Sequence, residues 1–133
     1  MLPDFRFHHI GIAVNNIDET AELYLAAGYN KTDTVYDPLQ NIHICFLNKD
    51  GMPTLELLAP EDDTSPVSKI LHKNGVTPYH CCYEVDDIDD AIKRLRKMRY
   101  IIVAKPLPAV AIGGRRVCFL FNKVVGLIEI VEK

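Results

Sequence analysis

The sequence predicts an α+β fold built from two tandem modules, each with one strand, one helix and three further strands in the order βαβββ. Two internal matches carry this prediction. The segment HIGIAVNNIDE, which begins at His9, returns 71 positions later as HCCYEVDDIDD from His80. A second pair, ICFL from Ile44 and VCFL from Val117, lies 73 positions apart. Matches that keep the same order indicate a duplicated unit of about half the chain.

The first module covers about residues 5–60 and opens with a strand in which apolar residues alternate with small or polar ones. Asn15 and Asn16 supply a candidate N-cap for the helix that follows, and Gly28 marks the end of that helix. The strands of this module are predicted near residues 7–14, 31–36, 42–47 and 54–58.

The second module covers about residues 78–133 and contains the clearest helix of the chain. Asp86 and Asp87 are its candidate N-caps. Basic residues occupy one face of this helix, and the opposite face carries an apolar stripe of Ile88, Ala91, Ile92, Leu95 and Met98. The strands of this module are predicted near residues 79–85, 101–104, 116–121 and 126–131.

A short helix at residues 65–75 is expected to connect the two modules. Ser65 is its candidate N-cap, Pro66 occupies its first position, and Asn74 and Gly75 mark its end. Because this connector is ordered, residues 1–133 are predicted to form a single domain.

Composition excludes several classes of protein. The chain has 133 residues, 48% hydrophobic and 25% charged, which is ordinary for a soluble globular protein. A net charge of −3 offers no basic excess for nucleic acid. No apolar run is long enough for a bilayer and no targeting segment is evident, so we expect no membrane partner and a cytoplasmic location. The four cysteines lack C-x-x-C spacing, which favours buried thiols over a thiolate metal site.

Four residues with metal-ligating side chains recur at matching places in the two modules. Strand side chains alternate between faces, so His9 points away from its apolar neighbours, and Glu56 does the same in LELL. His80 and Glu129 repeat this arrangement in the second module. A lone strand His or Glu is more often structural or solvated, but the repeated pairs favour ligands. If the modules pack about a pseudo-twofold axis, both pairs meet and suit a divalent first-row metal.

The motifs also resemble a known superfamily across almost the whole chain. HIGIAV from His9, the stretch from Tyr79 to Asp87, and GLIEI from Gly126 resemble the vicinal oxygen chelate (glyoxalase/bleomycin resistance/dioxygenase) superfamily. This resemblance implies paired βαβββ modules with curled mixed sheets around a metal-bearing cavity. It also implies a metal site, for Co, Ni, Zn or Mn, formed by His9, Glu56, His80 and Glu129.

Within that superfamily the chain looks most similar to methylmalonyl-CoA epimerases. The similar stretches are LELLAP from Leu55, SPVSKILHKNG from Ser65 and GGRRVCFL from Gly113. The resemblance implies a small-molecule substrate, an acyl-CoA thioester or a thiol hemithioacetal, and a homodimer. The ligand set also resembles that of nickel-type glyoxalase I, so it does not separate the two activities.

Methylmalonyl-CoA epimerases and glyoxalase I share one reaction step, the removal of a proton next to a carbonyl to give an enolate or enediolate. The resemblance makes Glu129 both a ligand and the candidate base. His43 is a weaker candidate for a second acid or base, and an outward polar position explains it at least as well. Arg115 and Arg116 are candidates for a substrate carboxylate or phosphate, or for a solvated turn.

The main prediction is therefore a metal-dependent, epimerase-like isomerase. The alternatives are a lactoylglutathione lyase of the glyoxalase I type and a metal-free drug-binding protein, which the intact ligand residues disfavour. An iron dioxygenase ranks lower, because Glu56 would occupy a position that oxygen chemistry needs.

Overall fold

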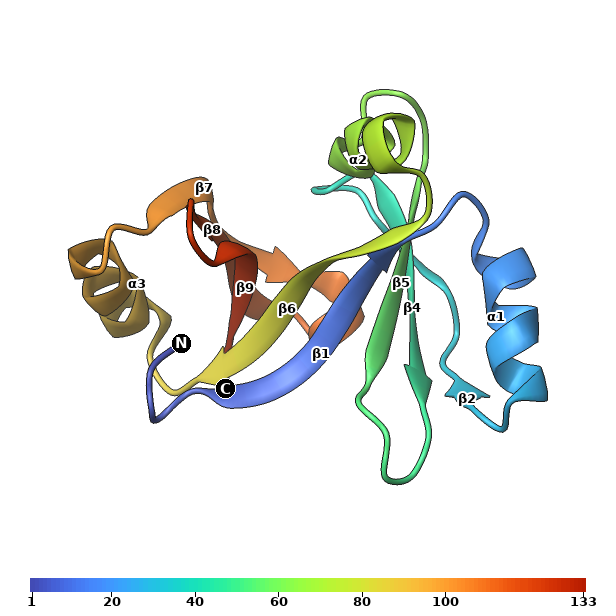
Figure 1. Cartoon of the computed structure of the whole chain (residues 1–133), viewed down its shortest axis with the longest axis horizontal. Helices are drawn as coiled ribbons and strands as arrows, with labels where there is room; N and C mark the ends of the chain where they lie inside the picture. The colour runs from blue at the N-terminus through green and yellow to red at the C-terminus, as the bar shows by residue number, and fades with distance from the viewer. The chain divides into compact units, whose positions relative to one another are not determined.

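The computed structural model describes residues 1–133 and confirms the predicted α+β class with the βαβββ order in each half (Figure 1). None of the three helices has the length and apolar character needed to cross a membrane. The elements are β1 (Arg6–Ala13), α1 (Ile17–Ala26), β2 (Asn30–Lys31), β3 (Val35–Asp37), β4 (Ile42–Asn48), β5 (Leu55–Pro60), α2 (Pro66–Asn74), β6 (Thr77–Val85), α3 (Ile88–Lys97), β7 (Ile101–Ala109), a 3-10 turn (Val110–Ile112), β8 (Arg115–Asn122) and β9 (Gly126–Glu132).

The chain divides into two compact units, which differ from the predicted modules at their edges. The first unit contains residues 9–79, and the second contains residues 1–8 together with residues 80–133. Both boundaries fall inside strands, β1 and β6, whereas the predicted modules, about residues 5–60 and 78–133, were separated by the connecting helix. The connecting helix α2 therefore belongs to the first unit.

The first unit has a mixed sheet in the order β2-β4-β5-β1, with β3 also paired to β4. Strands β1 and β5 run parallel, and the other pairs run antiparallel. Helix α1 begins at Asn16, whose side chain accepts a hydrogen bond from the Glu19 N–H at 3.0 Å. The buried core shared by this helix and one face of the sheet consists of Ile12, Val14, Ile17, Ala21, Cys45, Leu47, Leu57 and Ala59.

One predicted strand of this unit is split in two. The expected strand at residues 31–36 appears as β2 and β3, separated by Thr32 to Thr34. In that gap the Thr32 hydroxyl accepts a hydrogen bond from the Phe46 N–H, and the Lys31 ammonium donates to the Thr34 hydroxyl. Such bonds from side chains compete with the ladder of the sheet and interrupt the strand.

The second unit repeats the arrangement with the sheet order β6-β9-β8-β7, in which β6 and β9 run parallel. Asp87 caps α3 by accepting a hydrogen bond from the Asp90 N–H at 3.0 Å. The predicted apolar stripe of α3 is buried against one face of the sheet, except for Met98, which lies past the helix end and is 48% exposed. The sheet side of this core consists of Val85, Cys118, Leu120, Ile128 and Ile130.

Strand β7 extends five residues beyond its predicted end at Ala104 and includes Pro106 and Pro108. Proline cannot donate to a ladder, so it is tolerated at a sheet edge and at bulges. Both conditions hold here, because β7 pairs only with β8 and its register shifts between Ile102 and Leu107.

Candidate metal centre

In the first unit the parallel pairing of β1 and β5 brings His9 to Glu56. Gly11 lies opposite Glu56 in the register, and His9 lies two residues earlier on the same face of β1. The His9 Nε2 and Glu56 Oε1 atoms are 3.2 Å apart, and neither side chain is more than 4% exposed. This face of the sheet is the one turned away from α1, since Leu55 and Leu57 pack toward the helix.

In the second unit β6 and β9 build an equivalent pair. Cys82 lies opposite Glu129 in the parallel register, and His80 lies two residues before Cys82. The His80 Nε2 and Glu129 Oε1 atoms are 3.6 Å apart, again with both side chains at most 4% exposed. The neighbours of Glu129, Ile128 and Ile130, face α3, so this pair also lies on the face without a helix.

The chemistry of each pair fits a metal ligand set. A carboxylate held away from water needs positive charge or hydrogen bonds beside it. Two neighbouring ligand atoms on one ion, with bonds of about 2.0–2.2 Å, lie about 3.0–3.5 Å apart. The observed distances of 3.2 and 3.6 Å are close to that spacing. Imidazole nitrogen with carboxylate oxygen suits first-row divalent ions.

An aromatic ring stands beside each imidazole, a feature that sequence reasoning did not assign. Phe46 lies opposite Glu56 in the β4–β5 register, and Phe119 lies opposite Glu129 in the β8–β9 register. Their rings contact His9 and His80 edge to face, with centroids 5.4 and 5.1 Å apart. Both phenylalanines belong to the repeated Cys-Phe-Leu segments, so the duplication is the sequence signal for their equivalent positions.

His43 and the His9–Glu56 pair lie on opposite faces of the sheet in the first unit. His43 lies opposite Ala59 in the β4–β5 register, on the face of the sheet that packs against α1. Its imidazole Nε2 is paired with the Glu61 carboxylate, and 38% of its side chain is exposed. This position favours the outward polar residue, which the sequence offered as the alternative to a second acid or base, for His43.

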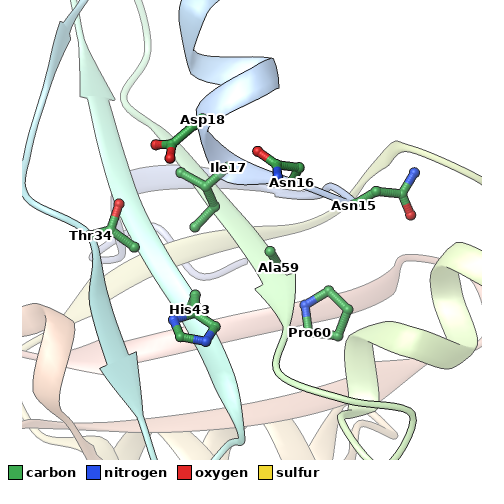
Figure 2. A pocket seen from close by; sticks show the side chains of 8 residues that line it. All are labelled: Asn15, Asn16, Ile17, Asp18, Thr34, His43, Ala59 and Pro60. Atoms are coloured by element: carbon green, nitrogen blue, oxygen red, sulfur yellow. The ribbon is translucent and has the colours of Figure 1, made fainter.

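His43 instead lines a surface pocket of about 290 Å³ at the start of α1 (Figure 2). The lining residues are Asn15, Asn16, Ile17, Asp18, Thr34, His43, Ala59 and Pro60. The duplication explains why this pocket is open in the first unit. At the repeat spacing of 73, the counterparts of His43 and Ala59 in the second unit are Arg116 and Glu132. In the second unit these two larger side chains form an ion pair at 3.0 Å. Smaller residues leave that space open in the first unit.

Arg115 and Arg116 both have carboxylate partners within the second unit. Arg115 Nη2 lies 2.6 Å from Glu84 Oε2, and Arg116 Nη2 lies 3.0 Å from Glu132 Oε2. Glu84 also accepts a hydrogen bond from Arg6 at 3.0 Å. These ion pairs favour a structural role for the two arginines over recognition of a substrate anion.

Glu84→Gln is expected to lower the free energy of unfolding near pH 7 by about 1 kcal/mol, because an amide bonds both arginines less strongly. Hydrogen bonds from Arg115, and then from Arg6, hold the pKa of Glu84 below its usual 4.5. A group with a lowered pKa stabilises the fold above its unfolded-state pKa, and that stability is lost as the pH falls through the folded value.

The loss of stability in the Glu84→Gln variant should therefore be complete near pH 7 and should shrink at about pH 3. Urea unfolding at both pH values measures it. An equal loss at the two pH values would show that the ion pairs are not its cause.

Comparison with known proteins agrees with this geometry. Residues 8–119 match the model of the Glyoxalase/Bleomycin resistance protein/Dioxygenase superfamily. The mitochondrial methylmalonyl-CoA epimerase of Dictyostelium discoideum is 32% identical over 96% of this chain and 78% of its own length. The ethylmalonyl-CoA/methylmalonyl-CoA epimerase of Cereibacter sphaeroides is 30% identical over 89% of each chain.

Solved structures give the same result. The methylmalonyl-CoA epimerase of Mycobacterium tuberculosis superposes with a TM-score of 0.85 at 29% identity, over 96% of this chain and 87% of that one. A methylmalonyl-CoA epimerase in complex with methylmalonyl-CoA and NH4+ superposes with a TM-score of 0.84 at 29% identity, over 97% and 94% of the two chains. The chain therefore belongs to the Glyoxalase/Bleomycin resistance protein/Dioxygenase superfamily, and within it to the methylmalonyl-CoA epimerase family, a family of isomerases.

Proposed function

We propose that this protein epimerises methylmalonyl-CoA by removing and returning the proton on the carbon next to the thioester carbonyl. We further propose that His9, Glu56, His80 and Glu129 together hold one divalent ion. The observation that carries the proposal is the buried imidazole–carboxylate pair found once in each unit, at 3.2 and 3.6 Å. Relatives with the same fold are methylmalonyl-CoA epimerases, and one was solved with methylmalonyl-CoA bound.

The duplication supports one shared ion over two separate ions. Each pair supplies two ligands, and a stable site for a first-row ion needs more than two. His9, Glu56, His80 and Glu129 would together supply four ligands to such an ion. A divalent ion there supplies a Lewis acid that polarises the thioester carbonyl and stabilises negative charge on its oxygen.

Glu129 is the proposed base of the reaction. Its carboxylate takes the proton from the α-carbon, and the electron pair of the broken C–H bond moves toward the carbonyl. Return of the proton by Glu129 to the same face would restore the substrate, and inversion of the carbon would require a proton delivered to the opposite face by a second donor. His43 is not included, because it lies on the helix-side face of its sheet.

We also propose that the protein forms a homodimer in a reducing compartment such as the cytoplasm. Exposed apolar side chains on and beside β7, among them Ile101, Val103 and Phe121, support association with a second copy. All four cysteines are free, which is usual where disulfides are kept reduced. Sedimentation of the purified chain tests the dimer.

The test of the function is isotope exchange by the metal-loaded protein in deuterated water. We expect methylmalonyl-CoA to gain deuterium at its α-carbon and its two epimers to interconvert, as followed by NMR and chiral analysis. The hemithioacetal of methylglyoxal and a thiol, given in parallel, should remain unconverted. Product thioester from the hemithioacetal, without exchange in the acyl-CoA, would replace the epimerase with a lyase.

A further inference from the structure

We infer that Phe46 and Phe119 are positioning residues that hold the imidazoles of His9 and His80 in the orientation needed to bind a metal ion. The inference rests on the proposed function, because it concerns the same four ligands. It goes further by assigning a role to two residues that donate nothing to the ion.

The contacts are the same in both units. The rings of Phe46 and His9 cross at 77°, and the rings of Phe119 and His80 cross at 86°. Each phenylalanine also lies directly opposite the glutamate partner of its histidine in the strand register. In each unit, one phenylalanine ring therefore lies beside both the histidine and the glutamate of the pair.

Edge-to-face contact restricts rotation of an imidazole. The negative face of one ring attracts the positive edge of the other, so turning the imidazole about its Cβ–Cγ bond loses this attraction. Such rotation would also carry Nε2 away from the carboxylate, which lies 3.2 Å away in the first unit and 3.6 Å away in the second. Residues that orient a metal-binding histidine raise metal affinity without touching the ion.

The positions of Phe46 and Phe119 within their own units distinguish this role from ordinary core packing. The apolar cores under α1 and α3 do not include Phe46 or Phe119. Both rings are half-buried on the opposite faces of the sheets, where the ligands lie. A side chain that served only the helix-packed cores would lie on the other face.

The experiment compares Co²⁺ binding by the wild-type chain, Phe46→Leu and Phe119→Leu, using calorimetry and the visible spectrum of bound Co²⁺. Each leucine variant is expected to bind Co²⁺ about threefold to tenfold more weakly. The double variant should bind Co²⁺ more weakly than either single variant. The spectrum should also change, since it reports the geometry of the ligands.

Two controls isolate the effect of the ring. Phe46→Tyr and Phe119→Tyr keep the ring, so both affinity and spectrum should stay at the wild-type values. Phe7→Leu removes an exposed ring whose edge-to-face contact is with Tyr83, and it should change neither readout. If a leucine variant fails to fold, Phe46→Met or Phe119→Met repeats the comparison with an unbranched, more adaptable side chain of similar volume to leucine.

Wild-type affinity and spectrum in the leucine variants would overturn the inference while leaving the metal site intact. Absence of Co²⁺ binding by the wild-type chain would instead overturn the proposed metal site itself. The two failures are therefore distinguishable in one series of measurements.

Discussion

Glu129→Gln is expected to lower the rate of α-proton exchange in methylmalonyl-CoA by about 10²–10⁴-fold at saturating metal. The amide oxygen of glutamine can still bind an ion, but the amide cannot accept a proton at neutral pH. The affinity for the metal should fall as well, which is why the comparison is made at saturation. Deuterium incorporation from deuterated water measures the rate.

The matched control for this substitution is Glu56→Gln, because the two glutamates occupy equivalent positions in the two units. Glu56→Gln should weaken metal binding to a similar extent yet keep most of the exchange rate once metal is saturating. Equal losses of rate in both variants would show that Glu129 contributes only as a ligand, and the base would then have to be another residue.

His9→Ala and His80→Ala are each expected to weaken Co²⁺ binding by at least about 100-fold, since losing even a hydrogen-bonding partner of a metal ligand typically costs 10–100-fold. Each substitution removes one nitrogen ligand and leaves its partner carboxylate buried. Calorimetric titration of the metal-free variants measures the affinity.

His72→Ala is the control for the histidine variants, because His72 is 76% exposed and is paired only with the surface residue Asp63, at 3.8 Å. It should bind Co²⁺ like the wild-type chain. Near wild-type affinity in His80→Ala, with strong loss in His9→Ala, would mean that the first unit holds the ion alone.

Much of the fold followed from local patterns. The repeat spacings of 71 and 73 predicted the duplication, and period-two alternation separated His9 from Ile10 and Ile12. Each helix cap was narrowed to a pair, Asn15–Asn16 and Asp86–Asp87, because an N-cap side chain acts on a backbone N–H only three residues away, and the structure selects Asn16 and Asp87. Patterns of this kind act over a few residues and so can be read without the tertiary structure.

The features that sequence missed depend on contacts between distant segments. The boundaries of the two units fall inside β1 and β6, where no change of composition marks them. The face occupied by His43 depended on the β4–β5 register, which pairs His43 with Ala59 and Phe46 with Glu56. The roles of Phe46 and Phe119 depended on the same kind of pairing, since neither ring is close in sequence to its histidine.

The most direct test of the shared metal site is the X-ray absorption spectrum of the Co²⁺-loaded protein, recorded at one ion per chain. The four proposed ligands predict a first shell of nitrogen and oxygen only, at about 2.0–2.2 Å, with outer-shell scattering from two imidazoles. One imidazole per ion, or a sulfur ligand such as Cys82 beside Glu129, would contradict a single site shared by both units.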